Sequence, residues 1–231
     1  MIQGPKHPGI DIDVFLETLM QEMETLWRNG IKIMDGFTRQ EFTLRAIIFV
    51  TINDYQVLFV LSGQVKGKTR CTVCIGDTVW IFLDGSRKVA YLGYRHFLVE
   101  GHIFRSKKFY NYFSGKANIE SVAEKRDGHH IFNMVRTIQV PYGKMTNDGK
   151  KRNRDKPPID GVPFKKMSIF YKYLSYWPDL EVRHAIDGMH LKKNVFGNTI
   201  GLLLETSAKT KDTLKSRQGS HGDQTRHSPY R

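Results

Sequence analysis

Two cysteines separated by two residues are the side chains of this sequence best suited to bind a metal ion. Cys71 and Cys74 lie in the stretch CTVC, which is followed by VWIFL, DGSR and KVAYLGY, and then by His96 and His102. Two thiolates, a hairpin around Asp84-Gly85 that brings the chain back, and two imidazoles would make a tetrahedral zinc site. The alternative is a pair of buried thiols in a reduced protein. One Cys-x-x-Cys pair leaves both interpretations open.

Two aspartates, Asp54 and Asp187, are candidates for carboxylate chemistry. Asp54 ends the run AIIFVTIND, and a carboxylate at the carboxyl end of a buried strand lies where open α/β sheets bind ligands. Its spacing alone favours a simpler role, an Asp that ends a strand in a turn. Asp187 and His190 precede an apolar run, where they either face a metal or start a helix, since Asp is a good N-cap. Lys192 stands where an acidic residue would suit a helix start better.

The segments around these residues predict an α/β protein. DVFLETLMQEMETLWRNG has a helical apolar period, which predicts a helix over 13–29 with Asp13 as its cap and Asn29-Gly30 as its stop. The continuous apolar run over 44–53 predicts a buried central strand. The predicted helix places an apolar stripe on one face, which we expect to be core: Leu16, Leu19, Met20, Met23, Leu26 and Trp27.

Charge indicates a nucleic-acid partner. The 231 residues carry a net charge of +13, and residues 105–166 hold fifteen Lys or Arg against six Asp or Glu. The stretch GKKRNRDKPP over 149–158 predicts a mobile linker that contacts DNA and can serve as a nuclear import signal. No apolar run is long enough to span a membrane, and two cysteines exclude a disulfide framework. The predicted DNA contacts in this linker are Lys150, Lys151, Arg152 and Arg154.

Three segments in order resemble the plant CACTA-type (En/Spm-like) transposases. They are GPKHPGIDIDVFLETLMQEMETLW, TINDYQVLFVLSGQVKGKTRCTVC and YWPDLEVRHAIDGMHLKKNVFGNTIGLLLETSAKTKDTL. The resemblance implies an RNase H-like (DDE-type) nuclease core interrupted by a Cys/His insertion. Such an enzyme cuts and joins DNA at transposon ends with two divalent metal ions, Mg²⁺ in the family, held by carboxylates. The implied division is a partial core over 1–63, the Cys/His insertion over 64–104, a basic, partly disordered region over 105–166, a returning core segment over 167–214 and a disordered tail over 215–231.

Departures from the family pattern lower the expected activity. Where the family commonly has Met-His-x-Glu-Lys-Asn, this chain has Lys192 in place of the Glu, a candidate metal ligand. The family's first catalytic Asp lies upstream of GPKHPG, so Asp54 and Asp187 are expected to be vestigial and Mg²⁺ binding is doubtful. In the insertion, Tyr94 stands at a family His position, which leaves His96 as its substitute and His102 as a further ligand.

We therefore expect a transposase-derived, nuclear protein that binds DNA without catalytic activity of its own. It has no small-molecule substrate and no membrane partner. One alternative is a non-enzymatic nucleic-acid-binding or regulatory remnant that also binds an intact transposase. The other is a decayed reading frame without function.

Overall fold

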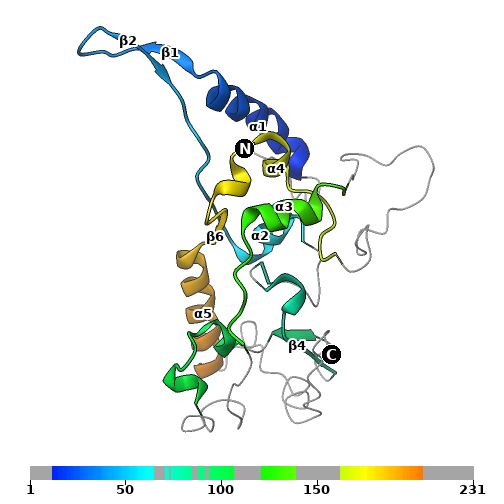
Figure 1. Cartoon of the computed structure of the whole chain (residues 1–231). Helices are drawn as coiled ribbons and strands as arrows, with labels where there is room; N and C mark the ends of the chain where they lie inside the picture. Colours follow the sequence, from blue (N-terminus) through cyan, green and yellow to red (C-terminus); the bar gives the residue numbers. More distant parts are fainter. Residues whose placement is uncertain are drawn as a thin grey trace, which may run out of the picture. The chain divides into compact units, whose positions relative to one another are not determined.

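The chain divides into two compact units, which are described separately. The computed structural model describes residues 12–64, 71–72, 74–84, 88–91, 94–106, 121–138 and 162–204. Unit 1 comprises residues 1–65 and 127–188, and unit 2 comprises 66–126 and 189–231. Both helices and short strands occur (Figure 1), and no helix among these residues is long and apolar enough to cross a membrane.

The elements of unit 1 come from two separate stretches of sequence. The first stretch holds α1 (Ile12–Arg28), β1 (Ile31–Met34), β2 (Glu41–Leu44), β3 (Thr51–Asn53) and α2 (Tyr55–Ser62). The second holds α3 (Gly128–Val135), α4 (Ile169–Tyr173), the 3-10 turn η6 (Trp177–Asp179) and β6 (His184–Ile186). Unit 1 therefore forms only when segments far apart in the chain pack together.

Helix α1 confirms the predicted N-terminal helix. It ends as expected, because Gly30 adopts a left-handed φ of +70° and a Cβ there would lie 2.8 Å from the carbonyl oxygen of Leu44. The predicted cap is wrong: Asp13 lies inside the first turn and is buried. Its Oδ1 is 2.6 Å from Nζ of the buried Lys166, so the carboxylate faces a cation in the core and does not cap the helix.

The core of unit 1 forms where α1 and α2 meet the segment around α4. The Phe170 and Trp177 rings stack with centroids 4.6 Å apart. The predicted stripe on α1 contributes only in part, because Met20 is buried whereas Leu19 is exposed. The buried members of this core are Met20, Leu61, Ile169, Phe170, Leu174, Tyr176 and Trp177.

The predicted buried strand over 44–53 is wrong in extent and in burial. Leu44 ends β2, and after it in this run only Thr51–Asn53 forms a strand, β3, which pairs in parallel with β6. Phe49 is 65% exposed and Ile52 is 68% exposed. Among the described residues β3 has one neighbouring strand, so the apolar run is not enclosed on both faces as a central strand would be. Ile48 does face the core, and its N–H donates to Tyr176 Oη at 2.8 Å.

The hairpin predicted around Asp84-Gly85 is confirmed in unit 2. Strand β4 (Trp80–Leu83) pairs antiparallel with β5 (Lys88–Tyr91), and Trp80 lies opposite Tyr91. The 3-10 turns among the described residues of this unit are η2 (Ile75–Asp77), η3 (Tyr94–Phe97) and η4 (Ile103–Arg105). Helix α5 (Gly188–Leu203) begins immediately after Asp187, in agreement with the interpretation of Asp187 as a helix start.

Candidate functional site

The two candidate catalytic aspartates follow adjacent parallel strands. Asp54 comes directly after β3 and Asp187 directly after β6, with Asn53 and Ile186 in register. The Asp187 N–H donates to the Asn53 carbonyl oxygen at 2.7 Å, which continues the pairing past the last strand residue. Neighbouring strands lie about 4.8 Å apart, so both carboxylates belong to one edge of this small sheet. This is the edge at which open α/β sheets bind ligands.

Asp54 has a structural role at this edge. Its Oδ1 accepts a hydrogen bond from the Val57 N–H at 2.7 Å, which makes it the N-cap of α2. A residue that replaces a missing backbone partner in this way typically stabilises the fold by about 1 kcal/mol. His190, the other candidate of the IDGMH stretch, lies in the first turn of α5. Within the part of the chain that the structure describes, no group of three or more His, Cys, Asp or Glu side chains is arranged to hold a metal ion.

A histidine at the opposite, amino-terminal ends of these two strands was not predicted from the sequence. His184 lies in β6 and makes edge-on contacts with the stacked rings of Phe170 and Trp177, with centroids 5.7 and 5.5 Å away. Burial, and then the charge of Arg183, lower the pKa of His184 to about 4. Its Nδ1 lies 2.6 Å from Thr51 Oγ1. A buried imidazole with this pKa is uncharged near neutral pH.

A chain of three side chains links the two strands. Asn53 Nδ2 donates to Thr51 Oγ1 at 2.7 Å, and Thr51 Oγ1 lies 2.6 Å from Nδ1 of His184. This chain joins β3 to β6 without any charge.

The predicted metal ligands of unit 2 are partly brought together. Cys74 Sγ lies 3.3 Å from His96 Nε2, and the Cys74 N–H donates to Cys71 Sγ at 3.3 Å. Zn–S bonds of about 2.3 Å and Zn–N bonds of about 2.0 Å at tetrahedral angles would separate sulfur from nitrogen by about 3.5 Å. The Cys74–His96 pair therefore fits a shared zinc ion. Cys71, three residues before Cys74, is half-buried.

The fourth candidate ligand, His102, is engaged elsewhere. Its Nδ1 accepts the Phe104 N–H at 3.2 Å and caps η4. His102 therefore does not join Cys74 and His96, and no set of three or more ligand side chains among the described residues is arranged to hold a metal ion. The hydrogen bond to Cys71, followed by burial, raises the pKa of the Cys74 thiol. A bound cation would have to overcome this preference, because the thiolate is the form that ligates zinc.

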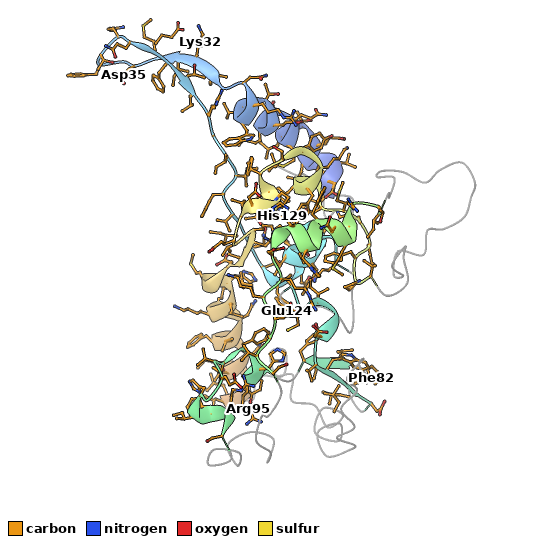
Figure 2. All side chains as sticks on the ribbon, viewed as in Figure 1. Lys32, Asp35, Phe82, Arg95, Glu124 and His129 are labelled. Atoms are coloured by element: carbon orange, nitrogen blue, oxygen red, sulfur yellow. The ribbon has the colours of Figure 1, made fainter. Side chains whose placement is uncertain are left out.

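Arg126 stabilises the turn that carries Cys71 and Cys74, a role that was not predicted from the sequence. Its Nη1 donates to the Cys74 carbonyl oxygen and its Nη2 to Asp77 Oδ2, both at 2.7 Å. Three residues earlier, the Ala123 N–H donates to the His96 carbonyl oxygen at 2.9 Å. Glu124, labelled in Figure 2, lies at 3.9 Å from Arg126 Nη2. One short segment thus holds the backbone of both Cys74 and His96, and nothing in its local sequence signals that role.

The predicted DNA contacts are not among the residues that the structure describes. Lys150, Lys151, Arg152 and Arg154 lie outside the described residues, as do the proposed linker over 149–158 and the tail over 215–231. The division of the chain predicted from the sequence also stays a prediction.

A comparison with protein families gives one match. Residues 1–138 match a family described as transposase family tnp2, which covers more than half of the 231 residues. The matched part includes α1, β3 with Asp54, and the turn that carries Cys71 and Cys74. No curated protein and no solved structure matches the chain. The transposase relationship predicted from the sequence is confirmed at the level of the family.

Proposed function

Because this chain belongs to the transposase family tnp2, we propose that it is a transposase-derived protein that binds DNA and does not cut or join it alone. Binding in the nucleus, descent from plant CACTA-type elements and an RNase H-like core are parts of the same proposal. Three family-like segments and the net charge of +13 support it.

The observation that carries the proposed lack of activity is Lys192. Two-metal phosphoryl transfer requires several carboxylates around two dications about 4 Å apart. An ammonium at the position of a ligand would repel those ions and has no lone pair to offer while protonated. Of the aspartates that remain, Asp54 already uses one carboxylate oxygen to cap α2. Asp54 and Asp187 at adjacent strand ends are together too few for the two-metal reaction.

A nicking assay tests this proposal. Purified full chain is incubated with supercoiled plasmid in Mg²⁺ and in Mn²⁺, and we expect no metal-dependent nicking above a buffer control. Asp54→Asn is the matched variant, because Asn retains the capping oxygen while losing the charge that a metal needs. Nicking by the wild-type chain that disappears in Asp54→Asn would overturn the proposal.

DNA binding is tested by its dependence on salt. Each phosphate contact releases condensed counterions, so log K should fall linearly with log salt by about 0.9 per contact. Replacing Lys150, Lys151, Arg152 and Arg154 with Gln should flatten the slope by up to about 3.6. A matched control replaces four cations of unit 1 with Gln: Arg28, Lys32, Arg39 and Arg45. An unchanged slope in the linker variant would place the contacts elsewhere in the chain.

A structural zinc ion is the cofactor that we propose for unit 2. The fit of Cys74 and His96 to a shared ion supports it, with Cys71 as the third ligand. When bound, zinc would supply a cross-link within a unit that has little core of its own. His102 as a fourth ligand requires the η4 turn to release its Nδ1 or to present its other ring nitrogen.

A further inference from the structure

The β1–β2 hairpin has one apolar and one mainly polar face. In the antiparallel register Ile31 lies opposite Leu44 and Ile33 opposite Phe42, whereas the other face carries Lys32, Met34, Glu41 and Thr43. Opposed residues point to the same face, and alternate pairs to opposite faces. The four apolar side chains therefore form one surface, which we call the hairpin face: Ile31, Ile33, Phe42 and Leu44.

Among the residues that the structure describes, the hairpin face is only partly covered. Ile31 is 49% exposed and Phe42 is 44% exposed, and the two strands form a separate two-stranded sheet. An isolated two-stranded hairpin is marginally stable in water and normally packs its apolar side on another element. Figure 1 shows it as a blue ribbon beyond the end of α1. We therefore expect another surface to pack against this apolar face.

The tip of this hairpin is held in one conformation and presents an aromatic ring. Asp35 Oδ1 accepts from the Phe37 N–H at 2.9 Å, and from the N–H and hydroxyl of Thr38 at 2.6 and 2.8 Å. The Asp35 N–H in turn donates to the Gln40 carbonyl oxygen, and Arg39 takes a left-handed φ of +54°. Phe37 is 95% exposed on this fixed turn. Little conformational entropy would be lost when a partner covers it.

Charge discriminates between nucleic acid and protein as the partner. From Ile31 to Leu44 the hairpin has two cations, Lys32 and Arg39, and two anions, Asp35 and Glu41, so its formal charge is zero in a chain of +13. Lys32 and Glu41 also pair with each other at 2.9 Å (Figure 2 labels Lys32 and Asp35). A DNA-contacting arm gains its affinity from excess positive charge, which is missing here. A neutral surface is also one where two copies of a basic chain meet without repulsion.

We propose that the hairpin face is a homodimer contact, in which the faces of two copies pack against each other across a twofold axis. The same patch serves both copies in such an interface, and an apolar face without net charge satisfies that condition. The exposed apolar area of the face with Phe37 amounts to about 500 Å² per copy, so a dimer would bury about 1,000 Å². This is the lower limit for a specific interface, and it predicts a dissociation constant in the range of about 1–100 µM.

The oligomeric state of the full chain tests the proposal. Light scattering coupled to size exclusion, repeated over a concentration series, should show a reversible dimer. Replacing both Ile31 and Phe42 with Thr retains a residue suited to strands but removes the apolar contacts, and should raise the dissociation constant about 100-fold or more. Lys32→Thr is the matched control on the polar face and should leave the dimer intact. A monomeric wild-type chain, or a dimer that persists in the double variant, would overturn the proposal.

Photo-cross-linking covers the case in which the double variant does not fold. The chain is made with p-benzoylphenylalanine at Phe37 and, as a control on the polar face, at Lys32. We expect a cross-linked product of twice the chain mass from the first position only. Cross-linking of the Phe37 position to added DNA, with no product between two chains, would show a nucleic-acid arm and exclude a dimer contact.

Discussion

Replacing Lys166 should destabilise unit 1 more than breaking an exposed ion pair would. Lys166 Nζ lies 2.6 Å from Asp13 Oδ1, and both side chains are almost completely buried, so they form an ion pair inside the core. Lys166→Met leaves the Asp13 carboxylate buried without its cation. Breaking a buried pair on one side typically costs about 3–5 kcal/mol. Replacing both residues by apolar ones, Asp13→Leu with Lys166→Met, removes the buried charge altogether and should cost about 1 kcal/mol or less.

Urea unfolding measures this difference. Trp177 is fully buried in unit 1, and its fluorescence reports the loss of that core. With a dependence of about 2 kcal/mol per molar urea, a loss of 4 kcal/mol would lower the midpoint by about 2 M. Lys172→Met is a matched control, because Lys172 pairs at 3.0 Å with Glu17, one turn further along α1, but both side chains are exposed. Its midpoint should change little, since exposed pairs are screened by solvent.

The double variant decides between two explanations. If it unfolds as early as Lys166→Met does, the cost comes from lost packing of the lysine stem and not from an unpaired carboxylate. A Lys166→Met midpoint equal to that of Lys172→Met would refute the reasoning altogether.

Three further predictions concern the sites. His184 takes up a proton at about pH 4 when folded but near pH 6.5 when unfolded, so stability should fall as pH drops from about 6.5 to 4. This loss of stability is at most about 3 kcal/mol, and solvent that reaches part of the ring reduces it. It should be smaller in His184→Gln, which urea unfolding curves at several pH values would show. Asp54→Ala should cost about 1 kcal/mol through the lost cap, and Asp54→Asn much less, measured by thermal unfolding; equal losses would contradict the capping role. About one zinc per chain should be found by elemental analysis after mild purification and lost in Cys71→Ser or at low pH, and folded, reduced protein without zinc would contradict the site.

The periodic and locally determined elements could be predicted from the sequence. The 3.6-residue apolar period and Gly30 were sufficient for α1, and Asp84-Gly85 between two apolar runs was sufficient for the β4–β5 hairpin. The run over 44–53 was misjudged because an apolar composition does not reveal how many neighbouring strands will cover it. The β1–β2 hairpin escaped because its turn depends on the Asp35 side chain and on a left-handed Arg39, a conformation that favours Gly.

The candidate sites were predictable as residue types but not as geometry. Asp54 and Asp187 could be named from motifs, but their common edge depends on a parallel pairing across most of the chain. Lys166 and Arg126 lie in stretches that look like ordinary basic surface, and their roles arise only from groups distant in sequence, Asp13 and the Cys74 carbonyl. Long-range electrostatic contacts of this kind have no periodic signature.

The parallel pairing of β3 with β6 has a consequence for the time at which unit 1 forms during synthesis. Thr51 and His184 are 133 residues apart. At a synthesis rate of about 5–20 residues per second, β3 waits roughly 7 to 27 s for its partner strand. During that interval Met20 and Leu61 have no cover from α4 or from the Trp177 turn, which supply most of the core. A chain released after residue 138 would hold the whole family-matched region and still fail to complete a folding unit, because its core arrives last.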